Sequence, residues 1–286
     1  MFEILRKSLA TGVVTSAYPN APAEVAPQAR GLPQFPFSDW KDAGPAAAAC
    51  PTAALSCTEK ARVRMVSFDL AKCTFCGLCA EADSAVRMTN KCELAARSRQ
   101  ELLTIATYPL QADGTQGKLM GNPTHPLTQA ADVTAVGAKL KQQIHHVLGR
   151  SLHIREVDAG SCNGCEVEIA GLNSPIYDVE RFGIHFVASP RHADMLLVTG
   201  PVSRNMELAL RKTYDAMPAP RLVVAVGACG CSGGIFGENY ASLGGVDKVL
   251  PVDVYIPGCP PNPYALLQGI LLAVGKWPNG QSQLRS

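Results

Sequence analysis

The feature that most constrains this chain is a run of three cysteines at three-residue intervals, Cys73-Thr-Phe-Cys76-Gly-Leu-Cys79. Three thiolates on one tight loop can hold one face of a cubane iron–sulfur cluster, and the fourth ligand must then come from elsewhere in the chain. The run therefore predicts a [4Fe–4S] cluster and leaves one ligand to be found.

A second cysteine run normally supplies that ligand. In proteins with two such clusters the run is C-x2-C-x2-C-x3-C-P, and its last cysteine binds the other cluster. Here only Cys50-Pro51 remains of a run of this kind. The three earlier positions of that run hold other residues, namely Trp40, Ala43 and Ala46. The run that begins at Cys73 also lacks its last cysteine and has Asp83 in that place.

The missing cysteines make up one complete ligand set, and the remaining ones make up the other. The retained set is Cys50, Cys73, Cys76 and Cys79. Random loss would rarely remove one whole set and spare the other, so we infer that one cluster was deleted and one was kept. A zinc site is the alternative, although zinc usually binds two C-x2-C motifs rather than a triple run. Cys57 and Cys92 fit neither set and are expected to be ordinary thiols.

A second group of cysteines begins after residue 160. Cys162 and Cys165 follow an apolar strand predicted at 152–157, and Cys229 and Cys259 each follow another apolar run. The carboxyl ends of parallel strands meet at one edge of a sheet, where α/β proteins build their sites. We therefore expect these four thiols to hold a second [4Fe–4S] cluster, and we do not expect Cys231 to be a ligand.

Glycines surround Cys229 in the stretch VAVGACGCSGG. They let the backbone approach the sulfurs and donate N–H groups to them. A nucleotide-binding loop is the rival interpretation of this turn, but the spacings of both common phosphate-binding motifs are absent.

The periodicity of apolar residues divides the chain. Strands are predicted at 152–157, 195–198 and 222–226, with helices at 136–148, 166–172, 205–217 and 263–274. Alternating strands and helices indicate a mostly parallel sheet covered on both faces. We expect a first cluster domain over 1–105, a linker over 106–135 and a second cluster domain over 136–286.

Composition limits the partners and the compartment. The formal net charge is +2 and no run of like charges occurs, so no nucleic-acid partner is expected. No stretch approaches the about 18 apolar residues of a membrane-spanning helix, so a chain that works at a membrane would lie on it. Eleven cysteines in a reducing compartment favour metal ligation over disulfides. Residues 1–19 are interpreted as a retained, short amphipathic helix rather than a signal peptide.

The later motifs resemble the small subunit of membrane-bound, energy-converting [NiFe] hydrogenases of the formate hydrogenlyase type, together with the related 20 kDa subunit of complex I. GSCNGCEVEI, VGACGCSGGIF and VYIPGCPPNP carry this resemblance over about residues 150–276. The complex I relative has adjacent cysteines in place of Cys162-x-x-Cys165, which favours the hydrogenase side. MFEILRKSLATGVVTSAYP, RGLP, ACPTAAL and KCTFCGLC resemble a ferredoxin-like subunit of the same complexes, which normally carries two clusters.

The resemblance implies a fusion of two neighbouring subunits: a small N-terminal α+β ferredoxin-like domain and a flavodoxin-like α/β domain with a mostly parallel sheet. It implies that the cluster nearest the catalytic site is held by Cys162, Cys165, Cys229 and Cys259, and the next one by the set that begins at Cys50.

A fused chain of this kind would not be catalytic. It would pass single electrons between a ferredoxin-like or other redox partner and a large catalytic subunit, beside integral membrane subunits. Its place would be peripheral, on the cytoplasmic face of the inner membrane. The alternatives are the same role in a complex I-like, quinone-reducing or nickel-free complex, and a zinc-bearing structural adaptor.

Overall fold

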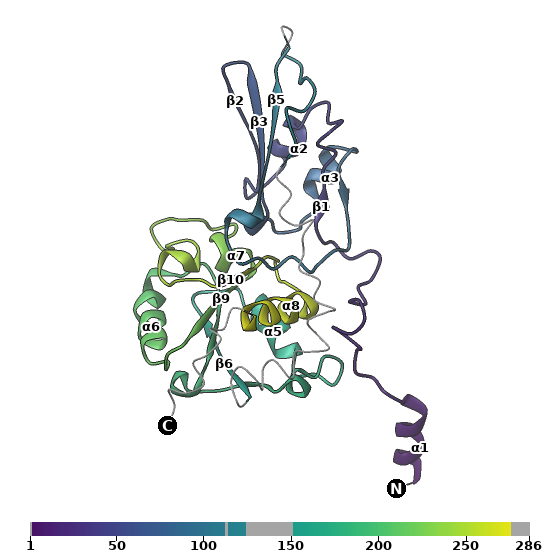
Figure 1. The fold of residues 1–286 in the computed structure, drawn as a ribbon, viewed down its shortest axis with the longest axis vertical. Helices are drawn as coiled ribbons and strands as arrows, with labels where there is room; N and C mark the ends of the chain where they lie inside the picture. Colours follow the sequence, from purple (N-terminus) through teal and green to yellow (C-terminus); the bar gives the residue numbers. More distant parts are fainter. Residues whose placement is uncertain (1, 112–113, 124–150, 276–286) are drawn as a thin grey trace.

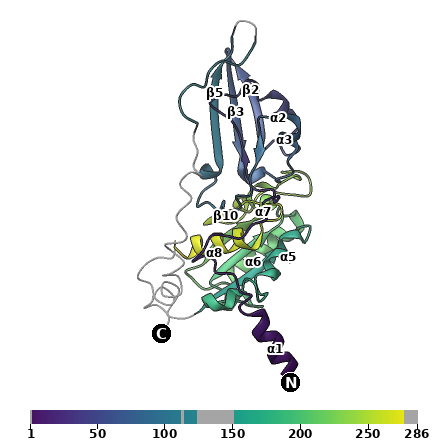
Figure 2. The ribbon, with the colours of Figure 1, turned by 90° about the vertical axis from the view of Figure 1, so that its right-hand side faces the viewer.

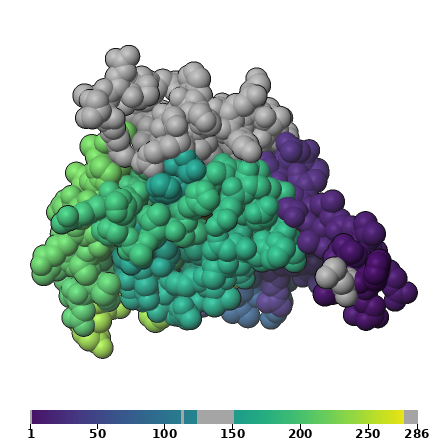
Figure 3. All heavy atoms as spheres, turned by 90° about the horizontal axis from the view of Figure 1, so that it is seen from below, coloured from purple at the N-terminus to yellow at the C-terminus, as the bar shows by residue number. Residues whose placement is uncertain are grey.

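The computed structural model describes residues 2–111, 114–123 and 151–275 (Figure 1). An antiparallel sheet comes from the N-terminal half of the chain and a parallel sheet from the C-terminal half. Figure 2 shows the antiparallel sheet standing above the parallel one, with the helix α1 (Phe2–Thr11) extending from the opposite end. Seen from below, the α/β unit fills most of the face, and the N-terminal segment leaves it at one side (Figure 3).

The parallel sheet has five strands in the order β10-β9-β8-β6-β7, and every neighbouring pair is parallel. Numbered along the chain, this order is 2-1-3-4-5, the flavodoxin-like arrangement. Its strands are β6 (Leu152–Asp158), β7 (Ile184–Phe186), β8 (Met195–Thr199), β9 (Leu222–Val226) and β10 (Val254–Ile256). The predicted α/β class is confirmed, and three of these strands coincide with predicted ones to within a residue.

Helices cover both faces of this sheet, as the alternation of β8 shows. Leu196 and Val198 join a core with Leu210 of α6, whereas Leu197 joins the opposite core with Leu267 of α8. Almost every residue of α8 is buried, which explains its continuous apolar sequence. The helices of this unit are α5 (Gly164–Gly171), α6 (Arg204–Asp215), α7 (Gly227–Ser232) and α8 (Pro263–Val274).

The antiparallel unit has a three-stranded sheet in the order β2-β3-β5 and a two-stranded pair, β1 with β4. Ala61 and Arg62 both have positive φ, which suits a tight two-residue turn between β2 and β3. The elements are β1 (Pro33–Gln34), α2 (Gly44–Ala48), β2 (Leu55–Lys60), β3 (Val63–Asp69), the 3-10 turn η1 (Leu70–Lys72), α3 (Leu78–Ala82), β4 (Arg87–Met88) and β5 (Leu103–Pro109). The unit is α+β, as predicted.

The first unit extends past the expected boundary at residue 105, because β5 continues to Pro109 and Gln116 donates to the carbonyl of Trp40 in the same unit. Other contacts join this unit to the α/β unit. Ala96 forms an antiparallel bridge with Tyr255 of β10, although more than a hundred residues separate the two in the sequence. One apolar core therefore contains residues of both units.

The N-terminal segment is also anchored on the α/β unit. Tyr18 is buried in its core, and the Arg181 guanidinium donates to the carbonyls of Ser16 and Tyr18. The expected helix at the start of the chain is present as α1, with all of its described side chains exposed. The helix expected at 136–148 lies outside the described residues. None of the helices in the described ranges is long and apolar enough to cross a membrane.

Packing of α8 on β10 generates a stability prediction. A methyl group on Gly269 would overlap the buried, β-branched side chain of Ile256. We expect Gly269→Ala to lower the free energy of unfolding by about 1–3 kcal/mol, because an overpacked core must shift. The melting temperature of equally metal-loaded protein measures this. In the matched control, Gly171→Ala, the new methyl meets nothing within 4 Å and should leave stability unchanged or slightly raised. Equal melting of the two variants would contradict the packing argument.

Candidate iron–sulfur sites

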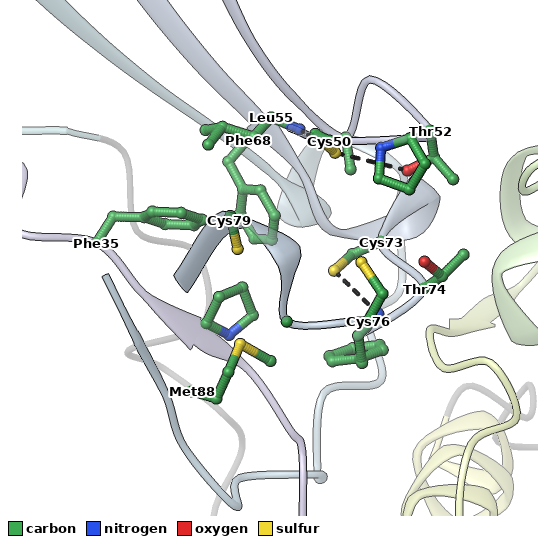
Figure 4. Close-up of a pocket in the computed structure, with 15 residues that line it drawn as sticks. Phe35, Cys50, Thr52, Leu55, Phe68, Cys73, Thr74, Cys76, Cys79 and Met88 are labelled. Carbon is green, nitrogen blue, oxygen red and sulfur yellow. Dashed lines mark hydrogen bonds between the residues drawn. The ribbon is translucent and has the colours of Figure 1, made fainter. Parts of the chain in front are cut away.

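The first cysteine set lines one pocket in the antiparallel unit (Figure 4). Its members come from the end of α2, the end of η1, the following loop and the first turn of α3: Cys50, Cys73, Cys76 and Cys79. Apolar side chains complete the wall, among them Phe35, Phe68 and Met88. The structure thus brings the four predicted ligands together in a largely apolar place.

Backbone geometry turns the sulfurs of this set inward. Phe75 and Gly77 both have positive φ, so the loop reverses within a few residues. The N–H of Phe75 donates to Sγ of Cys73 at 3.4 Å, and the N–H of Leu55 donates to Sγ of Cys50 at 3.4 Å. Such N–H donors are what a negatively charged thiolate requires, and they tune the potential of a bound cluster.

The protonation of these thiols also shows their mutual proximity. The pKa of Cys73 is raised to about 12, chiefly by burial; the N–H of Phe75 opposes this rise, and charge repulsion from the other three thiols of the set contributes to it. The metal-free thiol is therefore protonated at neutral pH. A metal group bound here takes thiolates, so its binding would release protons.

The positions of the missing ligand set also meet in space, and protein atoms fill the place between them. Trp40 is 3% exposed, and its Nε1 donates to Oδ2 of Asp83 at 2.8 Å. The ring stacks on Phe35 with centroids 5.4 Å apart. Ala43 and Ala46 are completely buried in the same core. The residues at the four positions that lack the expected cysteines are thus packed in the core or hydrogen-bonded to one another.

The second cysteine set lies beyond the carboxyl ends of three strands of the parallel sheet. Cys162 and Cys165 follow β6, Cys229 lies in α7 directly after β9, and Cys259 follows β10. This edge is where the flavodoxin-like arrangement places its ligands. Cys162 and Cys259 are exposed, whereas Cys165 and Cys229 are partly buried.

Two positions beside this set require glycine, because a side chain at either one would collide with a cysteine sulfur of the set. A Cβ on Gly227 would come within 2.7 Å of Sγ of Cys165, and one on Gly234 within 2.9 Å of Sγ of Cys229. Both glycines also have positive φ, at 78° and 56°. The glycine-rich turn is therefore shaped by close backbone approach to thiols, as its sequence predicts.

The pKa of Cys229 is raised to about 11, chiefly by burial and next by repulsion from the thiols of Cys259 and Cys162. Burial raises the pKa of Cys165 as well, with Glu166 as the next cause and the other three thiols after it. The thiols of this set therefore lie within range of one another's charge. Four thiols, close backbone approach and a partly buried edge fit a cubane cluster.

The two sets lie on either side of a shared boundary. The hydroxyl of Ser232, three residues after Cys229, donates to the carbonyl of Ala71 at 2.8 Å, two residues before Cys73. One pocket is lined by Phe75, next to Cys76, and by Pro260, next to Cys259. The fold thus brings the two ligand sets close together, although about 80 residues separate them in sequence.

The remaining cysteines belong to neither set. Cys231 is completely buried in the core, where its thiol contacts the carbonyl of Ala225 at 3.6 Å. Cys57 lies on β2, whereas the partly buried Cys92 lies near Asn262 and lines the same pocket as Phe75 and Pro260. Across the described ranges no group of three or more His, Cys, Asp or Glu side chains is arranged to hold a single metal ion.

Sequence reasoning missed Arg30, which stands in an extended, irregular lead-in segment. Its guanidinium donates to the carbonyl oxygen of Cys76 and lies beside Gly77. A single arginine in a Pro- and Ala-rich stretch has no periodicity or spacing that marks a site, so only the folded chain shows this contact.

Comparison with known proteins places the second set in a family. Residues 162–273 match the family described as NADH ubiquinone oxidoreductase, 20 Kd subunit. Formate hydrogenlyase subunit 7 of Escherichia coli is 48% identical over 150 residues, which is 52% of this chain and 57% of that protein. The probable membrane-bound hydrogenase subunit mbhJ of Pyrococcus furiosus is 46% identical over 134 residues, 47% of this chain and 80% of that protein.

A third relative comes from a quinone-reducing complex. This NADH-quinone oxidoreductase subunit of Desulfovibrio desulfuricans is 51% identical over 107 residues, 37% of this chain and 58% of that protein. The chain thus spans somewhat more than half the length of two of these three relatives. The family match begins at Cys162 and includes all four thiols of the second set. This chain belongs to the family of the NADH:ubiquinone oxidoreductase 20 kDa subunit, which includes subunits of membrane-bound hydrogenases.

Proposed function

We propose that this chain is a non-catalytic electron-transfer subunit with two [4Fe–4S] clusters, one on each cysteine set, and that it serves a membrane-bound [NiFe] hydrogenase complex. When bound, such a cluster takes up or releases one electron at a potential between about −700 and +450 mV. The proposal divides the chain into a ferredoxin-like unit and a hydrogenase small-subunit unit.

The observation that carries this proposal is the boundary shared by the two thiol sets. Phe75 and Pro260, each next to a ligand residue, line the same pocket. The hydrogen bond from Ser232 to Ala71 joins the segment that follows Cys229 to the segment that precedes Cys73. A structural metal site has no need of a second one beside it, whereas relaying an electron requires short separations.

The second set is the end that would meet a large catalytic subunit. Cys162 and Cys259 are exposed, and apolar side chains near the cysteines of this set in the sequence are exposed as well. Val167 is 63% exposed, Ile235 61% and Phe236 54%. Apolar side chains left exposed around a site are typical of an interaction surface. A partner seated there would exclude water from the thiols.

The first set would face the redox partner, which is ferredoxin-like or of another kind. The side chain of Trp40, buried and bonded to Asp83, would fill the place of a further iron–sulfur cluster. An electron would therefore pass between the partner and the set of Cys50 with no intermediate cluster in this chain. The electron would therefore pass through one cluster fewer than in a two-cluster ferredoxin-like subunit.

Attachment to the membrane would be peripheral, on the cytoplasmic face of the inner membrane and through integral membrane subunits. The helix α1 supports this proposal, because Phe2, Ile4 and Leu9 are each more than two-thirds exposed. Arg6 and Lys7 lie on the same short helix. An exposed apolar face with basic neighbours suits a membrane surface or the subunits embedded in it.

A complex I-like role is the second candidate. The similarity to an NADH-quinone oxidoreductase subunit favours it, because that relative is 51% identical over the matched region. The electron-transfer role of this chain would be the same, and only the partner and the substrate would differ. The Cys162-x-x-Cys165 spacing favours the hydrogenase side.

The decisive test is purification of the native complex from membranes through this chain. We expect nickel in the complex and hydrogen-dependent reduction of a dye, because the large subunit would carry the nickel site. Intact clusters without nickel or hydrogen activity would instead support the complex I-like role. A colourless chain that contains zinc and no iron would remove the electron-transfer proposal altogether.

Removing one ligand tests the division into two sets. In the purified chain, Cys50→Ala should lower the iron content from about eight to about four atoms per chain, because the first cluster loses a ligand and the second keeps all four. Iron analysis with electron paramagnetic resonance of the reduced protein measures this. Cys57→Ala is the matched control and should keep all the iron. Loss of both cluster signals, or of neither, would overturn the division.

Replacing Trp40 tests whether side chains, and not a metal group, occupy the place of the missing ligand set. Trp40→Phe removes the indole N–H and leaves the Asp83 carboxylate without this donor, so the free energy of unfolding should fall by about 1–3 kcal/mol. Denaturant unfolding followed by circular dichroism measures the loss. Asp83→Asn keeps an oxygen that can accept from Trp40 and should cost less. Iron content should stay unchanged in both variants, and a loss of iron would contradict a filled, metal-free place.

A further inference from the structure

One charged side chain lies at the junction of the two ligand sets. The Arg30 guanidinium donates to the carbonyl oxygen of Cys76, a member of the first set. Its Cζ, Nε and Nη1 atoms all lie 3.6 Å from the position that a Cβ of Gly77 would occupy. The planar group therefore lies against the loop that carries Cys76.

The same side chain lines a pocket together with neighbours of the second set. Arg30 and Phe75 line this pocket, as do Gly258 and Pro260, which stand on either side of Cys259. Arg30 thus contacts a ligand residue of the first set directly and shares the pocket with the neighbours of Cys259.

The positive charge of Arg30 is not neutralised by an ion pair within the residues that the structure describes. The ion pairs there involve other arginines, such as Arg64, Arg99 and Arg211. A guanidinium keeps its positive charge throughout the physiological pH range. Arg30 therefore brings a permanent positive charge to the junction.

We propose that Arg30 sets the difference in reduction potential between the two clusters by holding this charge beside the first one. The proposal rests on the proposed function, because it requires a cluster on each set. A reduced cluster carries one more negative charge than an oxidised one, so a nearby cation stabilises the reduced form and raises the potential. Coulomb energy falls with distance, so the first cluster gains more than the second.

The consequence is a bias in where the electron resides. With Arg30 in place, the electron is held more strongly on the set that includes Cys76. Without the charge, the first potential falls further than the second, and transfer from the first set to the second becomes more favourable. Arg30 thus acts only through its positive charge, and none of its atoms takes part in the electron transfer.

The test is a redox titration of the purified, cluster-loaded chain followed by electron paramagnetic resonance. The Cys50→Ala variant assigns the signals, since it should retain only the second cluster. We expect Arg30→Gln to lower the midpoint potential of the first cluster, with a smaller decrease for the second. Arg30→Lys keeps the charge and should stay near the wild type.

Arg62→Gln is the matched control for the loss of one positive charge. Arg62 lies in the turn between β2 and β3, at the end of the hairpin away from Cys50 and Cys73. Its replacement should leave both potentials unchanged. Potentials of Arg30→Gln that equal those of the wild type, or that fall only as much as in Arg62→Gln, would overturn the proposal.

Iron analysis precedes the titration and separates the possible failures. A wild-type chain with only one cluster signal defeats the proposed function itself, before Arg30 is considered. If Arg30→Gln loses iron, Arg30→Met provides a second uncharged side chain of similar length. If neither uncharged variant holds the first cluster while Arg30→Lys does, the charge is needed to retain the cluster, and a role limited to setting the potential is overturned.

Discussion

The hydrogen bond from Ser232 to the carbonyl of Ala71 marks the contact on which the rest of this structure depends. It joins α7, which carries Cys229, to η1, which leads directly to Cys73. Both elements are very short, and helical segments of this length are not stable on their own, so tertiary contacts must hold them in place. The common core of the two units, completed by the pairing of Ala96 with Tyr255, provides the rigidity that keeps the two thiol sets beside each other.

Packing of the first unit is consistent with the predicted absence of a second cluster there. A bound cluster would occupy space in the core of a small unit, and an empty place of that size would be costly. Trp40 fills it with the largest side chain available, and Asp83 satisfies the indole N–H at 2.8 Å. Stacking on Phe35 and the buried Ala43 and Ala46 complete the packing. Apolar burial thus stabilises the positions at which a two-cluster unit is expected to have cysteines.

Sequence patterns predicted those features that depend on spacing along one segment. Strand and helix periodicity located β6, β8, β9 and α8 almost to the residue, because each is long or completely buried. The cysteine spacing predicted two groups of four, and the fold brings each group together. The expected boundary at residue 105 fell inside β5, because the Pro- and Gly-containing stretch that suggested a linker begins only at the end of that strand. Contacts between distant segments could not be predicted from the sequence. The strand β7 has only three residues and is defined by its pairing with β6. Arg30 contacts the Cys76 loop only because the folded chain brings its segment against that loop.

The two thiol sets differ in their exposure. The second set has two exposed cysteines, with exposed apolar side chains close to its members in the sequence, so another protein is expected to cover it. The first set lies within its own apolar pocket, with the Arg30 guanidinium against the loop of Cys76. Charge also differs between the two, because the carboxylate of Glu166 lies near enough to raise the pKa of Cys165 in the second set. The same fold that brings the sets together therefore also distinguishes them, and a relay needs that distinction if its two ends are to serve different partners.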